Sequence, residues 1–140
     1  MKLLEGKTVL VTGASTGIGR AAAQAAAAAG HTVVATARRP ETLADLVAAH
    51  PGRVHALPLD VTDDASVAAA VDAALGLVDG VDVLLNNAGI GLFSTIEESG
   101  AADAREVMEA NFWGAARVTT ALLPHLRERR AGHILTVSSI

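Results

Sequence analysis

Thr8-Val9-Leu10-Val11-Thr12-Gly13-Ala14-Ser15-Thr16-Gly17-Ile18-Gly19 is the stretch that decides the fold of this 140-residue chain. An apolar, β-branched run leads into a glycine-rich turn and then into an alanine-rich stretch, which predicts a strand, a tight turn and a helix. Glycines let the backbone bend sharply and approach phosphates without Cβ clashes. The first turn of a helix also offers unpaired N–H groups to an anion. The predicted diphosphate site therefore comprises Gly13, Ser15, Thr16, Gly17, Ile18 and Gly19.

The composition is that of a folded domain. The chain is 51% apolar, and its net charge of −4 gives no attraction to nucleic acid or to an anionic membrane. No apolar run approaches the ~20 residues that a membrane span needs. The absence of cysteine is compatible with a cytoplasmic location. The five histidines have no ligand-like spacing, so no metal site is predicted.

Strand-like and helix-like segments alternate along the whole chain. This alternation predicts an α/β fold with a doubly wound parallel sheet, the Rossmann fold, in the strand order 3-2-1-4-5. The strand-like runs are continuous rather than alternating, which is typical of strands covered on both faces. The predicted strands are Thr8–Val11, Thr32–Ala37, Val54–Leu57, Val83–Leu85 and Ile134–Val137.

Turn and capping residues delimit the predicted helices. Thr62 is the expected N-cap of the third helix, because Asp63 and Asp64 follow it in the positive first turn. Pro124 lies inside the longest helical segment and predicts a kink or break there. The alanine-rich first helix is expected to pack closely on the sheet. The predicted helices are Ile18–Ala29, Thr42–His50, Asp63–Leu77 and Ala102–Arg129.

The last predicted strand stops where it reaches the carboxyl edge of the sheet. We expect it to be buried, and folded domains rarely end so abruptly at the edge where ligands bind. Residues 1–140 are therefore expected to form the N-terminal, cofactor-binding part of a single domain whose C-terminal part is absent.

Arg38 and Arg39 stand where dinucleotide-binding folds choose between two cofactors. An acidic residue about 20 positions beyond the glycines holds the ribose 2′-hydroxyl of NAD, whereas an arginine accommodates the 2′-phosphate of NADP. No acid precedes Glu41 in this turn. Arg38, ahead of Arg39, therefore predicts NADP, with NAD the less favoured cofactor. The alternative explanation is that both arginines merely solvate a strand end.

Polar residues also follow the third and fourth strands. Asp60 is placed to accept from the exocyclic amine of an adenine, or to cap the next turn, and the two roles are compatible. In Asn86-Asn87-Ala88-Gly89, small residues admit a nicotinamide ribose and the amides can bond neighbouring strands. An ordinary turn explains the same residues without a ligand.

Two further polar positions remain. Asn111 lies inside the long helix, where asparagine competes for backbone hydrogen bonds and so needs a reason to be there. A wet helix face is the simpler explanation. Ser138 and Ser139 end the fifth strand, and no histidine–acid pair lies near them in sequence to make either a nucleophile.

Together these residues resemble the short-chain dehydrogenase/reductase family. The matching motifs are Thr12–Gly19, Asp60-Val61, Asn86–Gly89, Asn111-Phe112-Trp113-Gly114 and the serine after Ile134-Leu135-Thr136-Val137. They occur in the family's order over the whole chain. The spacing T-G-x-x-x-G-x-G also differs from that of the family's longer branch of sugar epimerases.

The resemblance implies reversible hydride transfer between a nicotinamide and a small-molecule alcohol or carbonyl. It implies that Ser139 polarises the substrate oxygen and that Asn111 supports a helix irregularity and a water relay. It also implies a homo-oligomer joined through the long helix. The implied cofactor contacts are Gly13, Ser15, Ile18 and Gly19 for the pyrophosphate, Asp60 and Val61 for adenine, and Asn87, Ala88 and Gly89 for the ribose and nicotinamide.

The chain departs from the family in one respect. The family's proton donor is a tyrosine followed four residues later by a lysine, and this chain contains no tyrosine. The chain alone is therefore expected to be inactive, as the cofactor-binding portion of an NAD(P)-dependent enzyme. The alternative is a short protein that binds a nucleotide or regulates a partner without catalysis.

Overall fold

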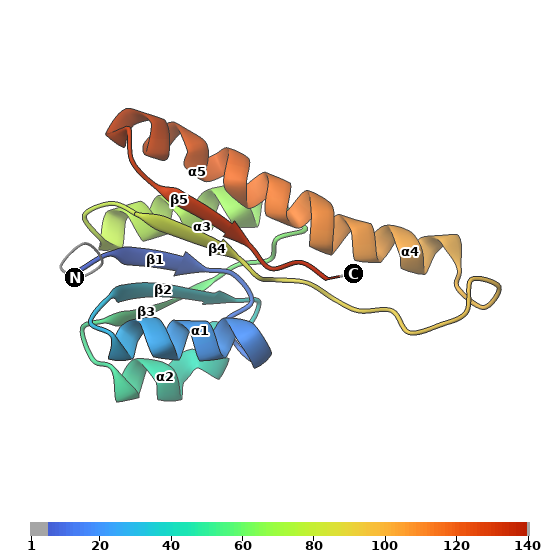
Figure 1. Ribbon diagram of the computed structural model, residues 1–140, viewed down its shortest axis with the longest axis horizontal. Coiled ribbons are helices and arrows are strands. Elements are labelled where there is room, and N and C mark those ends of the chain that lie inside the picture. Colours follow the sequence, from blue (N-terminus) through green and yellow to red (C-terminus); the bar gives the residue numbers. More distant parts are fainter. Residues whose placement is uncertain (1–5, 140) are drawn as a thin grey trace.

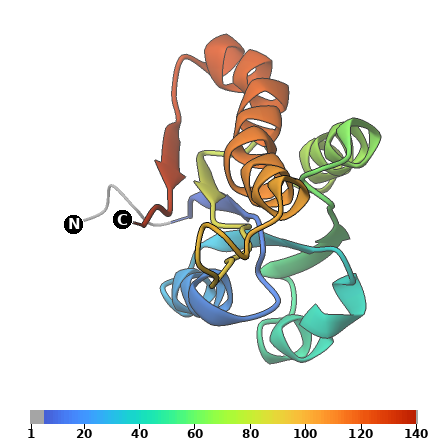
Figure 2. The same ribbon diagram turned by 90° about the vertical axis from the view of Figure 1, so that its right-hand side faces the viewer.

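The computed structural model describes residues 6–139 and places five parallel strands in one sheet with the order β3-β2-β1-β4-β5. Helices cover both faces (Figures 1 and 2). The predicted doubly wound Rossmann fold and its strand order are therefore confirmed. The strands are β1 (Thr8–Val11), β2 (Thr32–Ala37), β3 (Val54–Pro58), β4 (Val83–Asn86) and β5 (His133–Thr136).

The helices follow the predicted alternation, with differences of detail. The second helical region begins as a 3-10 turn, Pro40–Leu43, before it becomes α-helical. The long helix contains a π-helical segment, Glu109–Gly114, which we call the π-segment. The α-helices are α1 (Gly17–Ala28), α2 (Ala44–Ala49), α3 (Asp64–Leu77), α4 (Ala101–Met108) and α5 (Ala115–Arg129).

The core lies in two clusters, one on each face of the sheet. Neighbouring strand residues point to opposite faces, so Leu10 belongs to one cluster and Val11 to the other. One cluster joins the sheet to α3 and α5, and the other joins it to α1 and α2. On α1, Ala23 and Ala27 are buried, and their small side chains let the helix pack closely on the sheet, as expected.

The predicted break at Pro124 is wrong. Helix α5 continues through this residue to Arg129. Proline lacks the N–H that would bond the carbonyl of Thr120 four residues earlier. Thr120 and Pro124 are both exposed, so this carbonyl is on the solvent side of the helix, and the helix continues without interruption. The irregularity lies further toward the N-terminus, in the π-segment.

The N-cap of α3 is Asp63 rather than Thr62. The Asp63 carboxylate accepts hydrogen bonds from the backbone N–H groups of Ala65 (2.8 Å) and Ser66 (3.1 Å). The Thr62 hydroxyl instead donates to Asp60 Oδ1 at 2.7 Å. The Thr62 side chain is thus used in the local turn that Asp60 caps, and Asp63 caps the helix.

The expectation that the fifth strand is buried is wrong for the described residues. All four residues of β5 are exposed, with Ile134 at 41% and Leu135 at 54% of their full accessibility. Within residues 6–139, β5 is an edge strand that pairs with β4 alone. Its apolar side chains therefore lack the cover that β1, β2 and β4 receive.

Candidate functional site

The turn between β1 and α1 has the conformation that a diphosphate cradle needs. Gly13 and Gly17 have φ values of +64° and +59°, which favour glycine. Helix α1 begins at Gly17, and its N-cap residue Thr16 makes no side-chain capping bond. The first N–H groups of α1 thus have no capping side chain, and they lie at the carboxyl end of β1 (Figure 1). This end can hold an anion.

Gly19 allows α1 to pack directly against the turn. A Cβ at this position would lie 2.3 Å from both Asn87 Nδ2 and the Gly13 carbonyl oxygen. The Asn87 amide donates to the carbonyls of Thr12 and Gly13, each at 3.1 Å. An asparagine amide was predicted to bond a neighbouring strand, and the Asn87 amide bonds the turn that directly follows β1. It fixes the cradle against the loop after β4.

Thr12 has a structural role in the candidate site that its place in the motif did not predict. Its hydroxyl oxygen accepts from the backbone N–H groups of Asn87 and Ala88, each at 3.0 Å, and the residue is 1% exposed. These bonds commit both N–H groups to Thr12, the residue that directly follows β1. Any ribose contact from these two residues therefore uses carbonyl oxygens or Asn87 Oδ1. The only sequence signal was a threonine directly before the first glycine of the turn.

Asp60 and Arg38 stand at the carboxyl ends of β3 and β2. Asp60 Oδ1 accepts from the Thr62 hydroxyl and from the Thr62 N–H at 2.9 Å, which is the turn-capping role left open above. The Thr62 hydroxyl bond, the Thr62 N–H bond and the positive charge of Arg38 hold the pKa of Asp60 below its usual value. Arg38 is exposed. The rim therefore presents an exposed cation beside an ionised carboxylate.

Val61 contributes mainly to the core. Its side chain is 8% exposed and packs against the π-segment, because a Cβ on Gly114 would lie 2.6 Å from Val61 Cγ2. A contact from Val61 to adenine therefore has to come from its backbone or from the small exposed part of its side chain.

Asn111 is exposed, as on a wet helix face, but it also has a definite partner. Its Oδ1 accepts from the Ile90 N–H and its Nδ2 donates to the Ile90 carbonyl, both at 2.8 Å. The pair of bonds ties the π-segment to the loop that follows Gly89. The implied helix irregularity at Asn111 is confirmed by the π-segment. The implied water relay stays a prediction.

Asn86 and the serines lie at the same edge. Asn86 is buried, and its Nδ2 donates to Thr119 Oγ1 at 2.9 Å, so this amide ties β4 to α5. The Val137 N–H donates to the Asn86 carbonyl at 2.9 Å, which carries the β4–β5 pairing one residue past β5. Ser138 and Ser139 are exposed and follow at the carboxyl edge. Candidate site residues that follow all five strands thus lie along one rim.

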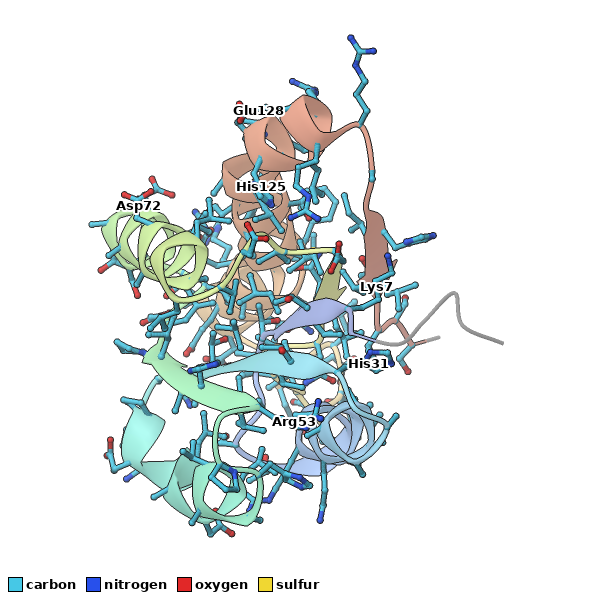
Figure 3. All side chains as sticks on the ribbon, turned by 90° about the vertical axis from the view of Figure 1, so that its left-hand side faces the viewer. Lys7, His31, Arg53, Asp72, His125 and Glu128 are labelled. Carbon is cyan, nitrogen blue, oxygen red and sulfur yellow. The ribbon has the colours of Figure 1, made fainter. Side chains whose placement is uncertain are left out.

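The opposite edge of the sheet has a different character. Lys7, His31 and Arg53 each precede a parallel strand and lie at this amino edge (Figure 3). A polar hollow of about 670 Å³ lies there too. Beside it, Asp82 accepts from the Thr8 N–H at 2.8 Å and from Arg129 at 3.0 Å. The charges of this carboxylate and guanidinium are thus paired within the fold.

Comparison with known proteins identifies the class of protein. The family model described as short chain dehydrogenase matches residues 7–140, and the chain belongs to this family. Among residues 6–139 no helix is long and apolar enough to cross a membrane.

Solved structures support the same assignment. A short-chain dehydrogenase from Streptomyces avermitilis has a TM-score of 0.92 and 48% identity, covering 96% of this chain and 50% of its own. The 3-ketoacyl-(acyl-carrier-protein) reductase from Brucella melitensis, complexed with NADH, has a TM-score of 0.91 and 33% identity, covering 97% of this chain and 58% of its own.

Two curated relatives have similar identity. An uncharacterized oxidoreductase of Mycobacterium tuberculosis is 39% identical over 98% of this chain and 42% of its own length. A fatty acyl-CoA reductase of Acinetobacter baylyi is 39% identical over 98% of this chain and 48% of its own length. The chain thus spans somewhat less than half of these two relatives.

Proposed function

We propose that residues 1–140 are the cofactor-binding part of a single Rossmann-fold domain in an NAD(P)-dependent oxidoreductase. The observation that supports this proposal most directly is the start of α1. It has no side-chain cap, and it lies in the Gly13–Gly19 turn at the carboxyl edge of the sheet. The close approach at Gly19 leaves no room for a side chain. The residues fit a dinucleotide because they offer backbone N–H groups and a helix dipole to its diphosphate.

In this proposal the rest of the cofactor lies along the rim. Asp60 and Val61 contact the adenine, while Asn87, Ala88 and Gly89 contact the ribose and nicotinamide. Bound there, a nicotinamide would supply hydride transfer from an alcohol carbon or to a carbonyl carbon, with the substrate oxygen losing or gaining a proton. Ser139 polarises that oxygen electrostatically. Asn111 supports the site by holding Ile90.

We assign the cofactor preference to Arg38 and favour NADP over NAD. Support comes from the charge at the end of β2, where Arg38 and Arg39 are exposed and no acid precedes Glu41. Two of the similar solved structures are complexes with NADH and with NAD. These ligands are those of the two similar proteins. The nicotinamide half is common to both cofactors, so Arg38 bears only on the 2′-phosphate.

The test is the ratio of NADPH to NADH affinity in the full protein. Arg38→Asp should lower this ratio about tenfold or more, because charge-assisted hydrogen bonds contribute roughly 1.5–3 kcal/mol. Arg39→Asp is the matched control and should change the ratio less. An unchanged ratio in Arg38→Asp contradicts the assignment. Failure of both cofactors to bind favours a protein outside dehydrogenase chemistry.

Catalysis needs a proton donor that these residues do not include. The chain has no tyrosine, so we expect the 140-residue polypeptide to bind cofactor without turnover. In the full protein, Ser139→Ala should lower kcat and leave cofactor affinity near that of the wild type. Turnover by the 140-residue polypeptide alone would contradict this part of the proposal.

The partners in this proposal are a small alcohol or carbonyl substrate and further copies of the same protein. Met108, Phe112 and Trp113 are about half exposed on the long helix, and α4 has no buried residue. This apolar surface supports a homo-oligomer joined through α4 and α5. Light scattering of the full protein tests it, and a stable monomer contradicts it. A cytoplasmic location belongs to the same proposal.

A further inference from the structure

One arginine on α5 contacts three segments that surround the proposed site. Arg117 Nε donates to Asp64 Oδ1 at 2.7 Å, and Nη1 donates to the Val61 carbonyl at 3.4 Å. Nη2 forms a salt bridge with Glu109 Oε1. These partners belong to the first turn of α3, to the loop between β3 and α3, and to the π-segment. Arg117 thus joins pieces that lie far apart in sequence.

The contact suits a guanidinium and no other side chain. Its planar fork reaches several acceptors at once, whereas a lysine presents one compact charge. The Arg117 side chain is 24% exposed, and its hydrogen bond to Glu109, followed by the nearby carboxylate charges, raises its pKa above the usual value. The carboxylate partners therefore favour the charged form of the arginine.

An apolar contact reinforces the same junction. Val61 packs against Gly114, where a Cβ would approach Val61 Cγ2 to 2.6 Å. The π-segment that receives Val61 also carries Asn111, which holds Ile90 just after Asn87–Gly89. A continuous set of contacts therefore runs from the segment Asp60–Val61 through Arg117 and the π-segment to the loop after β4.

We infer that Arg117 is a positioning residue for the adenine end of the cofactor. Acting through Asp64, Glu109 and the Val61 carbonyl, it sets where Asp60–Val61 stands relative to the loop after β4. The inference rests on the proposed function, because it needs a dinucleotide that spans both segments. Its consequence is that a change on α5 alters nucleotide affinity through the β3–α3 loop.

The experiment is calorimetric titration of the full protein with ADP, which carries the adenosine and diphosphate and lacks the nicotinamide. Arg117→Met should weaken ADP binding about tenfold, the equivalent of losing one good charged contact. Arg117→Lys should recover part of this loss. Arg127→Met, an exposed arginine on the same helix, is the matched control and should bind like the wild type.

The outcomes separate the inference from the proposed function. If the wild-type protein binds neither ADP nor either dinucleotide, the proposed function is wrong. Wild-type protein that binds ADP with an affinity equal to that of Arg117→Met overturns the inference and leaves the proposed function standing. A merely structural role lowers the unfolding temperature of Arg117→Met without changing the ADP affinity of the folded fraction, and this result also overturns it.

Two single-contact variants keep the test decisive if Arg117→Met does not fold. Asp64→Asn and Glu109→Gln each remove the charge of one carboxylate partner of Arg117 and preserve the shape of that side chain. Each should weaken ADP binding by about two- to fivefold, because hydrogen bonds to charged groups are the stronger ones. In the active enzyme the same changes should raise KM for the dinucleotide more than they lower kcat. Unchanged affinity in both variants overturns the inference.

Discussion

Gly19 shows how a single missing side chain sets the geometry of the rim. Its position lies against the Gly13 carbonyl and the Asn87 amide, and these two groups are hydrogen-bonded to each other. The Thr12 hydroxyl oxygen accepts two further bonds, from the backbone N–H groups of Asn87 and Ala88 in the loop after β4. The turn after β1 and the loop after β4 therefore hold each other in place. A change in one of these two segments should shift the other.

Gly19→Ala tests the close approach. The added methyl meets backbone and amide atoms at 2.3 Å, so α1 has to move away from the turn. We expect a loss of roughly 1–3 kcal/mol in the free energy of unfolding, as for overpacked sites, and NADPH binding weakened more than tenfold. Urea unfolding and NADPH titration measure the two effects.

Gly76→Ala is the matched control for this change. Gly76 is exposed on α3, and a Cβ there meets no heavy atom within 4 Å. Alanine should therefore stabilise the helix by about 0.5–1 kcal/mol and leave NADPH binding unaltered. Equal behaviour of the two variants would contradict the packing argument.

The Asp60 carboxylate predicts an acid-sensitive contribution to stability. Its pKa is lowered from 3.8 by the Thr62 hydroxyl, the Thr62 N–H and Arg38, so the folded state favours the ionised form. This contribution is present above the unfolded value and is lost as pH falls through the lower folded value. Asp60→Asn should therefore be less stable than wild type near pH 7, with the gap closing below about pH 4. Unfolding temperatures across that range measure it, and a gap that persists in acid contradicts it.

At the scale of elements, the π-segment connects the long helix to the rest of the site. It places Asn111 against Ile90, and it seats Val61 on Gly114. The same stretch leads into α5, which carries Arg117. A π-turn contains one more residue than an α-turn. A regular α-helix over Glu109–Gly114 would therefore turn these side chains to other directions than the π-segment does. The irregularity is therefore a condition of the site geometry.

Removing the Asn111 amide should loosen the loop that follows β4. Asn111→Ala loses two hydrogen bonds to Ile90, and we expect about 1–2 kcal/mol of lost stability. In this variant, the hydrogen-exchange rate of residues 90–100 should increase over that of the wild type by more than the rate of β4 does. Asn111→Asp keeps the acceptor for the Ile90 N–H but places a carboxylate against the Ile90 carbonyl, so it should be at least as damaging as alanine. Unchanged exchange in both variants contradicts the clamp.

Pro124 illustrates what sequence patterns decide and what they leave open. The strands were predicted within a residue or two, because continuous apolar runs reflect burial on both faces. The break at Pro124 was wrong, because the outcome depends on whether the freed carbonyl faces water. Thr62 and Asp63 are both good caps, and the local turn in which Asp60 bonds Thr62 leaves the cap position to Asp63. The contacts of Arg117 were not predictable from sequence patterns, because its partner Asp64 is 53 residues away.

Pro124→Ala should stabilise the protein. The helix already passes through this position, so alanine restores one backbone hydrogen bond to Thr120 without rearrangement. We expect a gain of about 1–3 kcal/mol in the free energy of unfolding, less than the full helix-interior penalty of proline. Urea unfolding measures it, and a loss of stability would indicate that the proline has a packing role.

At the scale of the whole molecule, burial and polarity are arranged around one sheet. The two core clusters on opposite faces are separated by β1, β2 and β4, whose side chains alternate between them. The site residues were predictable as a set because parallel strands bring their carboxyl ends to one rim. The exposed face of β5 was not predictable, because its apolar residues look like those of a covered strand.

A ligand that bridges the rim should stabilise the whole fold. The cradle, the β2 end and the loop after β4 are separate segments in the unfolded chain, so a dinucleotide that contacts all three binds only the folded state. At about 100 times its Kd such a ligand adds roughly 2.7 kcal/mol to the free energy of unfolding. For a chain of this size we expect the unfolding temperature to rise by roughly 5–10 °C with NADPH. At the same concentration NADH should give a smaller rise, because it lacks the 2′-phosphate that Arg38 is proposed to hold. At the same NADPH concentration Gly19→Ala should show about half this rise or less, because binding weakened more than tenfold leaves the ligand at under about 10 times its Kd. An equal rise in this variant would mean that the nucleotide binds somewhere other than the turn.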